Sequence, residues 1–417
     1  MRLTPAFVRR HVPRALGWSL AGGAALQVAA AAGVIAVDEL RKRRDASETR
    51  FPSSEPRTID IAGTSVTSYT RGATLYDDMI EAIDSATELV LLESFIFKGD
   101  EVGRRFKDAL ERASRRGVSV YLIYDAFANL VVDPAFFRFD HRIHVLRFPV
   151  LRRGLLHFDL RHLGRDHRKI LVVDSRIGFV GGYNIGDTYA TKWRDTHLRI
   201  VGPAVWELED AFVDFWNEYR PRREPALDDR GAREWDSRIE AARNAPSRLL
   251  FPVRGLYLGA MERAHDRIWI TQAYFIPDGE ILGTLIKAAR RGVDVRLIVP
   301  EYSNHVVADW VARGYFQKLL EGGVRIWLYR NAMVHAKTAT VDGRWSTVGT
   351  ANIDRLSMVG NYEVNLAIYS DEMASHMEEI FAMDEGNSRE LTREEWASRG
   401  VFVRVVEAIL APLYPLL

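Results

Sequence analysis

The segments HRKILVVD (residues 167–174) and HAKTATVD (residues 335–342) share a histidine, a lysine and an aspartate at the same spacing, and they decide the fold. Each is followed after six residues by a small-residue turn that ends in asparagine, GGYN at 181–184 and GTAN at 349–352. Every shared position recurs 168 residues later, as for the two histidines (335 − 167). Five matches at about one in twenty each arise by chance on the order of 10⁻⁷ times per starting point, so the chain contains a duplication.

The sequence around the motifs repeats as well. RRGVSV at 115–120 matches RRGVDV at 290–295, and each copy lies between an amphipathic stretch and an apolar run. Such alternation predicts strand, helix, strand units. The offset of 175 residues (290 − 115) is far too long for a solenoid unit. We therefore expect two α/β domains of similar construction, each a mixed sheet flanked by helices.

Composition suggests where the domains end. We expect residues 1–58 to hold a membrane anchor and a polar tether, residues 59–220 the first domain, and residues 248–417 the second domain with an apolar end. Residues 221–247 are charged, poor in aliphatic side chains and bounded by prolines, which is typical of a linker.

Residues 15–37 form a run without any charge, dominated by alanine and glycine. This run is long enough to cross a bilayer as a helix. It is also longer than the apolar region of about 7–15 residues in a cleaved signal peptide, which is the alternative. We therefore predict a single-pass N-terminal anchor in the cell membrane. Basic residues lie on both sides of the run, so its orientation stays open.

Composition also restricts the chemistry. The 417 residues include no cysteine, which excludes disulfides, thiolate nucleophiles and cysteine-ligated metals. The 57 Lys and Arg residues nearly balance 56 Asp and Glu residues, for a formal net charge of +1. This balance argues against a broad surface that coats nucleic acid. Any recognition of phosphate must be local.

The paired motifs supply the groups that a phosphodiester substrate needs. Residues two apart on a strand share a face, so His167 with Lys169, and His335 with Lys337, can address one ligand. One neutral imidazole can attack phosphorus, while the other, protonated, donates to the leaving oxygen. The lysines can stabilise the charge that develops on the phosphoryl oxygens.

Four further residues complete the predicted site. The glycine-containing turns bring Asn184 and Asn352 beside the lysines as additional donors. At the same offset of 168 residues, Asp195 of the first repeat matches Glu363 of the second (363 − 195 = 168). Either carboxylate can bind the far ring nitrogen of a histidine and fix its tautomer.

The motif aspartates, Asp174 and Asp342, are candidates for the same site. Each follows an apolar strand-like run, so each is predicted to lie at a strand end. A structural role as a turn cap or salt bridge is therefore at least as good an interpretation as a chemical one.

At these residues the sequence resembles the phospholipase D superfamily, whose signature is a duplicated HxKxxxxD motif, and within it the bacterial cardiolipin synthases. Further segments of the same character are FIFKGD (95–100), QAYFIPD (272–278), NYEVNLAI (361–368) and LTREEW (391–396). The resemblance implies two fused, pseudo-twofold-related α/β/α domains with the active site between them, a phosphohistidine intermediate, and no metal or cofactor. It also implies that His167 is the nucleophile and His335 the general acid.

The substrate is less clear from the residues alone. Nine Lys and Arg residues between Arg138 and Lys169 can bind nucleic-acid phosphates or anionic lipid headgroups, but apolar segments interleave with them, which favours a lipid surface. We expect phospholipid substrates and no nucleic acid. The resemblance implies transfer between two phosphatidylglycerols to give cardiolipin and glycerol, with phospholipid hydrolysis or a membrane-anchored nuclease as alternatives. The oligomeric state stays open.

Overall fold

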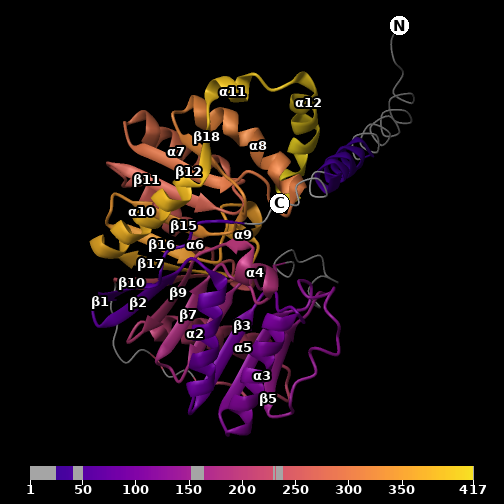
Figure 1. The fold of residues 1–417 in the computed structure, drawn as a ribbon, viewed down its shortest axis with the longest axis vertical. Helices are drawn as coiled ribbons and strands as arrows, with labels where there is room; N and C mark the ends of the chain where they lie inside the picture. The colour runs from indigo at the N-terminus through magenta and orange to yellow at the C-terminus, as the bar shows by residue number, and fades with distance from the viewer. Residues whose placement is uncertain (1–24, 41–49, 152–163, 229–230, 232–237, 417) are drawn as a thin grey trace, which may run out of the picture.

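The structure, a computed structural model, describes residues 25–40, 50–151, 164–228, 231 and 238–416, and it is built on two eight-stranded sheets (Figure 1). The first sheet contains, in spatial order, β1 (Arg57–Ile61), β2 (Thr64–Tyr69), β9 (His197–Val201), β7 (Ile177–Gly181), β6 (Lys169–Val173), β3 (Leu89–Ser94), β4 (Ser119–Asp125) and β5 (Ile143–Phe148). The second contains β10 (Ile239–Asn244), β17 (Glu363–Tyr369), β16 (Trp345–Gly349), β15 (Lys337–Val341), β11 (Arg267–Gln272), β12 (Asp294–Pro300), β13 (Arg325–Tyr329) and β18 (Ser388–Leu391). The parallel run β3, β4, β5 recurs as β11, β12, β13, and the antiparallel run β6, β7, β9 recurs as β15, β16, β17. The predicted α/β fold with two mixed sheets is confirmed.

Helices cover both faces of each sheet. The outer face of the first sheet carries α2 (Gly72–Ser85) and α3 (Glu101–Arg115), and that of the second carries α6 (Pro252–Glu262), α7 (Gly279–Arg290) and α8 (Val306–Glu321). The helices α5 (Val205–Tyr219) and α10 (Asp371–Gly386) lie between the sheets. The matching helices α3 and α7 begin alike, because Asp100 and Asp278 each accept N–H groups of the first helical turn.

The two halves share one hydrophobic core. Val172 and Val180 of the first sheet belong to the same buried cluster as Val348 and Val364 of the second. A short parallel pairing of β8 (Trp193–Arg194) with β14 (Met333–Val334) adds backbone bonds between the halves. The halves therefore form one body around their common interface.

The predicted linker over residues 221–247 is wrong in its last part. The strand β10 lies inside it and pairs along its full length with β17, so the second sheet already begins at Ile239. Within the segment IEAARN only the two end residues are buried, and backbone pairing holds the strand at the edge of the sheet. Its sequence therefore lacks the apolar alternation that would have predicted a strand.

The two ends of the chain meet on α8. Residues 25–40 are helical, and Val34 of this helix packs in one cluster with Val311 of α8 and with Leu410 of α12 (Val401–Leu410). Among the described residues no helix is both long enough and apolar enough to span a bilayer. Residues 15–24 of the predicted anchor lie outside the described residues.

Candidate active site

The two motif histidines stand at equivalent strand entrances, His167 two residues before β6 and His335 two residues before β15. Each backbone N–H donates to a carbonyl of the other half: that of His167 to Tyr362 over 3.0 Å, and that of His335 to Arg194 over 2.6 Å. Each acceptor is followed in the chain by one of the predicted orienting carboxylates: Tyr362 by Glu363, and Arg194 by Asp195. The strand pairing thus fixes each histidine beside the carboxylate of the opposite half.

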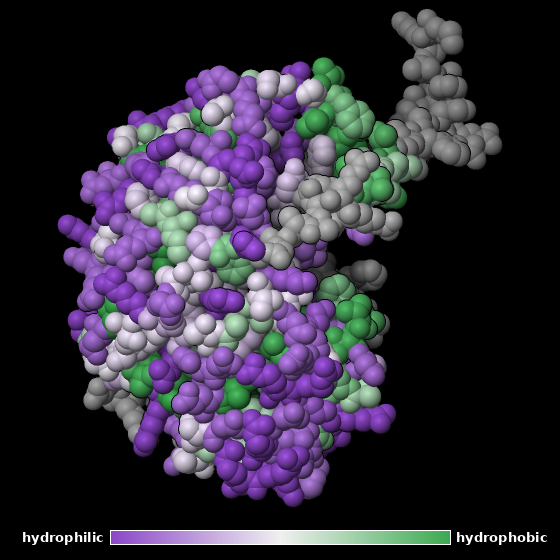
Figure 2. Space-filling model, in the orientation of Figure 1, coloured by the Kyte–Doolittle hydropathy of each residue, from purple (hydrophilic) through white to green (hydrophobic). Residues whose placement is uncertain are grey.

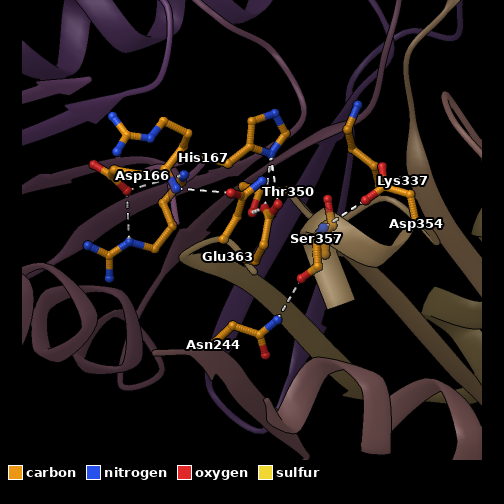
Figure 3. A network of polar contacts seen from close by, with 12 residues as sticks. Asp166, His167, Asn244, Lys337, Thr350, Asp354, Ser357 and Glu363 are labelled. Carbon is orange, nitrogen blue, oxygen red and sulfur yellow. Dashed lines mark hydrogen bonds and ion pairs between the residues drawn. The ribbon is translucent and has the colours of Figure 1, made fainter. Parts of the chain in front are cut away.

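The side chains follow the same crosswise pattern. His167 Nδ1 lies 3.0 Å from Glu363 Oε2, and His335 Nδ1 lies 2.6 Å from Asp195 Oδ2. In Figure 3 the His167 ring is directed at Glu363 and Thr350, both of which come from the second half. Because Nδ1 of each ring is engaged by a carboxylate, Nε2 is the nitrogen that each histidine offers to a ligand. The sequence predicted these carboxylates, but not that each serves the other half.

Aromatic rings flank both imidazoles. The ring of Phe95 lies 4.7 Å from that of His167, centroid to centroid, and Trp193 lies 4.9 Å from His335. Tyr274 contacts His335 edge-on at 6.3 Å. Both histidines are consequently almost buried, with 12% of the His167 side chain and 6% of the His335 side chain exposed.

Burial dominates the electrostatics of the imidazoles. It lowers the pKa of His335 to about 3, with Lys337 lowering it further and Asp195 opposing the shift. Burial also lowers the pKa of His167, while Glu363 raises it and the lysines of both halves lower it. Both rings are therefore neutral in the ligand-free site, as a nucleophile requires. An anionic phosphodiester between them would favour protonation of the ring that acts as the acid.

Each motif lysine folds back onto its own histidine. Lys169 Nζ donates to the carbonyl of His167 over 2.6 Å, and Lys337 Nζ donates to the carbonyl of His335 and lies 2.9 Å from its Nδ1. Burial lowers the pKa of Lys169 to about 7 and that of Lys337 to about 8, against the pull of the nearby carboxylates. The charge of Lys337, in the other half, lowers the pKa of Lys169 further.

The asparagines lie in the small-residue turns after β7 and β16. Asn184 Oδ1 accepts the backbone N–H of Ile96 over 3.2 Å, which leaves the amide N–H groups of Asn184 as its donors. Asn352 is buried, and its Oδ1 has no hydrogen-bond partner among the residues that the structure describes. Both positions suit a donor to a bound anion.

The two turns differ at the position that follows their first glycine, Gly182 in one and Thr350 in the other. A Cβ on Gly182 would lie 2.1 Å from Asp195 Oδ1, so only glycine leaves room for that carboxylate. At the matching position Thr350 donates its hydroxyl to Glu363 Oε2 over 2.5 Å. The first turn makes room for a carboxylate and the second turn binds one.

The motif aspartates lie at the other end of the strands. Asp174 accepts the backbone N–H groups of residues 87, 88 and 89 over 2.8 Å each, and Asp342 those of residues 265, 266 and 267 over 2.8–2.9 Å. Each aspartate lies seven positions after its histidine, roughly 20 Å along a strand. These contacts favour the structural interpretation, in which the aspartates anchor the loop that enters β3 or β11.

A third acidic group at the site, Asp354, was not predicted from the sequence. Its carboxylate caps α9 (Arg355–Val359) through the N–H of Ser357 over 2.7 Å, and Figure 3 shows it beside Lys337. Burial raises its pKa to about 7. The matching residue of the first half is Gly186 (354 − 168 = 186), so the comparison of the repeats could not reveal it.

Buried ion pairs hold the segments that carry the site. Arg168 pairs with Glu93 and, over 3.3 Å, with Asp166, which precedes His167. Arg194, next to Asp195, pairs with Asp384 of the other half over 2.8 Å. Arg168 is one of the nine basic residues between Arg138 and Lys169 that were predicted to bind phosphates or lipid headgroups, but it is buried, so it does not belong to such a surface.

Among the described residues, no group of three or more His, Cys, Asp or Glu side chains could hold a metal ion. The basic stretch that suggested lipid contact lies partly outside the described residues, at 152–163.

Known proteins are similar to this chain in sequence or in fold. The family described as "Cardiolipin synthase, PLD-like domain" matches residues 79–216 and 257–384, and each stretch contains one motif with its carboxylate. A cardiolipin synthase of Listeria monocytogenes is 34% identical over 356 residues, covering 82% of this chain and 73% of that protein. One of Staphylococcus aureus is 34% identical over 361 residues, covering 84% and 73%. Among solved structures, a phosphatidylserine synthase of Haemophilus influenzae has the same fold, with a TM-score of 0.64 at 15% identity over 90% of this chain and 97% of that chain.

Proposed function

The chain belongs to the cardiolipin synthase family of phospholipase D-like proteins, and from that premise we propose that it joins two phosphatidylglycerol molecules into cardiolipin and releases glycerol. It is a phosphatidyltransferase, and its substrates are phospholipids. The observation that carries the proposal is the crosswise pairing of His167 with Glu363 and of His335 with Asp195. This pairing gives two imidazoles with free Nε2 atoms around one site.

In the first step Nε2 of His167 attacks phosphorus of the donor lipid and the bond from phosphorus to the glycerol headgroup oxygen breaks. His335, protonated in the presence of the anion, gives its proton to that oxygen, and glycerol leaves. The lysine ammonium groups and the asparagine amides stabilise the charge on the equatorial oxygens.

In the second step the neutral His335 accepts the proton of a hydroxyl on the headgroup of a second phosphatidylglycerol. The resulting alkoxide attacks the phosphohistidine, the bond from nitrogen to phosphorus breaks, and cardiolipin forms while His167 is regenerated. Each imidazole ends in its starting protonation state, so the cycle balances without a cofactor.

An assay with headgroup-labelled phosphatidylglycerol tests the proposal. The full chain in detergent and lipid should release labelled glycerol and form cardiolipin in equal amounts. If the protein formed phosphatidic acid and no cardiolipin, it would be a phospholipid hydrolase and not a transferase. If it cleaved DNA and turned over no lipid, it would be a nuclease. The variant Lys318→Phe, at an exposed position of α8, serves as a control for nonspecific damage.

Attachment to the cell membrane through the N-terminal apolar run is a second part of the proposal. It is supported by the uncharged sequence of residues 15–37 and by exposed apolar side chains in the part of this run that the structure describes, among them Val28 (70% exposed) and Val37 (67%). Deleting residues 1–37 should move the protein from the membrane pellet to the supernatant of a carbonate-washed cell lysate. A deleted variant that stays in the pellet would contradict an anchor in this run.

A further inference from the structure

A cavity of about 770 Å³ lies between the helix of residues 25–40, α8, α12 and the ends of β11 and β12. This volume is within the range of about 300–1,000 Å³ that is usual for small-molecule sites. Both ends of the chain contribute to its wall, since Val34, Trp310 and Val406 all line it. The cavity is thus a product of the tertiary fold and not of one local segment.

The wall of this cavity is largely apolar. Leucine, valine, alanine, phenylalanine and tryptophan side chains make up most of it, including Phe275, Phe316 and Trp396. Charged groups on the wall pair with each other or with neighbours: Arg389 with Glu301 over 2.6 Å, and Arg313 with Glu407 over 3.1 Å. Such a space suits a long apolar group.

The cavity adjoins the active site at one residue. Tyr274 lines the cavity, and its ring contacts the ring of His335 at a centroid distance of 6.3 Å. The two residues are neighbours because the backbone N–H of Ala273 donates to the carbonyl of Ala336 over 3.1 Å. The cavity is therefore one side chain away from the position of the phosphorus at His335.

The outside of the same region is apolar. On α12, Val401 is 69% exposed and Phe402 is 78% exposed, and on the N-terminal helix Leu26 is 54% exposed. Figure 2 shows this hydrophobic surface around α12, beside the N-terminal helix at the upper right of the view. A lipid can reach the cavity across these helices without passing its chains through water.

We propose that this cavity binds an acyl chain of the phospholipid substrate whose phosphorus lies between the two histidines. The proposal rests on the phosphatidyltransferase function, because that function places a phosphatidyl group at His335 and requires its two chains to leave the site. An acyl chain is the one part of this substrate that is both long and entirely apolar, so it matches the wall of the cavity.

The first experiment measures glycerol release from monomeric, short-chain phosphatidylglycerols of four, six and eight carbons per chain. For the wild-type protein KM should fall by about fourfold per methylene that enters the cavity. In Ala308→Phe the new ring projects into the cavity and narrows it, because Ala308 lines it. KM for the eight-carbon lipid should then rise at least tenfold, while release of glycerol from glycerophosphoglycerol, which has no chains, stays within twofold of wild type.

The matched control is Lys318→Phe, which adds the same ring to an exposed position of α8 outside the cavity and should leave every KM unchanged. If Ala308→Phe kept the wild-type dependence on chain length, the acyl-chain site would be refuted although the transferase function would stand. A wild-type protein that releases no glycerol from any of these lipids would refute the proposed function itself.

A binding measurement covers the case in which Ala308→Phe fails to fold. Trp310 and Trp396 line the cavity, so phosphatidylglycerol with bromine atoms in its chains should quench their fluorescence. The inactive variant His167→Asn prevents turnover during the titration. Quenching should drop by more than half in the double variant Trp310→Phe, Trp396→Phe made in that background, and quenching that is unaffected by loss of both tryptophans would overturn the site.

Discussion

The two halves of the molecule share a strand order but hold their histidines differently. At His335 of the second half, Asp195 of the first half lies 2.6 Å from Nδ1, and Lys337 Nζ lies 2.9 Å from the same atom. At His167 of the first half, Glu363 of the second half lies 3.0 Å from Nδ1 and also accepts the hydroxyl of Thr350. His335 therefore stands between a carboxylate and an ammonium group, whereas His167 faces a carboxylate that is shared with a threonine.

This difference shows how a duplicated fold obtains two opposite roles. Equivalent strands give the two histidines equivalent positions, but each histidine binds the carboxylate of the opposite half. Neither half therefore contains both a motif histidine and the carboxylate that orients it. The unequal surroundings allow one imidazole to act as nucleophile while the other carries the proton. Substitutions made in matching pairs can test how far the two halves have diverged.

The largest effect is expected from the histidines. His167→Asn and His335→Asn should each reduce lipid turnover by about 10³-fold or more, since one removes the nucleophile and the other the acid. A phosphodiester with a p-nitrophenolate leaving group needs little protonation, so His335→Asn should recover most of its rate on that substrate, and His167→Asn should not. The rates of p-nitrophenol release measure this. Recovery in His167→Asn instead would exchange the two roles.

The carboxylates should have the next largest effect. Asp195→Asn and Glu363→Gln remove the acceptor for Nδ1–H and should lower kcat by about 10²-fold, because the imidazole loses its fixed tautomer. The important measurement is the double variant Asp195→Asn, His335→Asn. If Asp195 acts through the histidine of the opposite half, the double variant should be no slower than His335→Asn alone. If the losses of kcat in the two single variants multiplied in the double variant, Asp195 would act independently of His335.

Much of this architecture could be predicted from the sequence because the same residue types recur at a fixed offset in the two halves. His167, Lys169 and Asn184 recur at one offset, and apolar runs around them mark the central strands. Two features could not be predicted in this way. The exchange of Asp195 and Glu363 depends on contacts across the halves, 140 and 196 residues apart in the chain. Such long-range contacts leave no local pattern.

The missed elements lacked a pattern for a different reason. The strand β10 is held by backbone pairing and not by apolar alternation, so composition suggested a linker. Asp354 has no counterpart in the first half, where Gly186 stands, so the repeat gave no reason to select it. The role of the motif aspartates, Asp174 and Asp342, could not be decided from the sequence. An aspartate recurs at this position whether it takes part in the reaction or only stabilises the fold.

The turn residues should have a moderate effect and should differ between halves. Gly182→Ala places a methyl group where Asp195 lies and should reduce kcat by about 10- to 100-fold through displacement of that carboxylate. Thr350→Val removes the hydroxyl that donates to Glu363 and accepts the backbone N–H of Val364, and a loss of about tenfold in kcat is expected. Steady-state kinetics with phosphatidylglycerol measure both. Gly182→Ala activity equal to wild type would mean that Asp195 has room to move.

Because of the two motif lysines, activity should begin to fall with rising pH at a lower pH than the pKa of an ordinary lysine would give. Burial disfavours the charged form and lowers the pKa of Lys169 to about 7 and of Lys337 to about 8, so the ammonium donors are lost as the pH rises through this range. The value of kcat/KM should fall by about tenfold between pH 8 and pH 9. The limb of kcat should lie at higher pH, because a bound anion stabilises the ammonium groups. A value of kcat/KM that is constant up to pH 9.5 would argue that both lysines keep their protons.

The smallest effect on activity is expected from Asp174→Ala and Asp342→Ala, which should act equally on the two halves. Each change leaves three backbone N–H groups without their acceptor, so unfolding free energy should fall by about 1–3 kcal/mol while kcat stays within twofold. Although burial raises their pKa, the backbone amides outweigh it and hold the pKa of both carboxyls below the ordinary value. Their stabilisation is therefore complete above about pH 4 and is lost as the pH falls through the lower folded-state pKa. Urea unfolding should show the difference from wild type at pH 7 and a smaller difference towards acidic pH. A large loss of kcat with unchanged stability would instead return these aspartates to the chemistry.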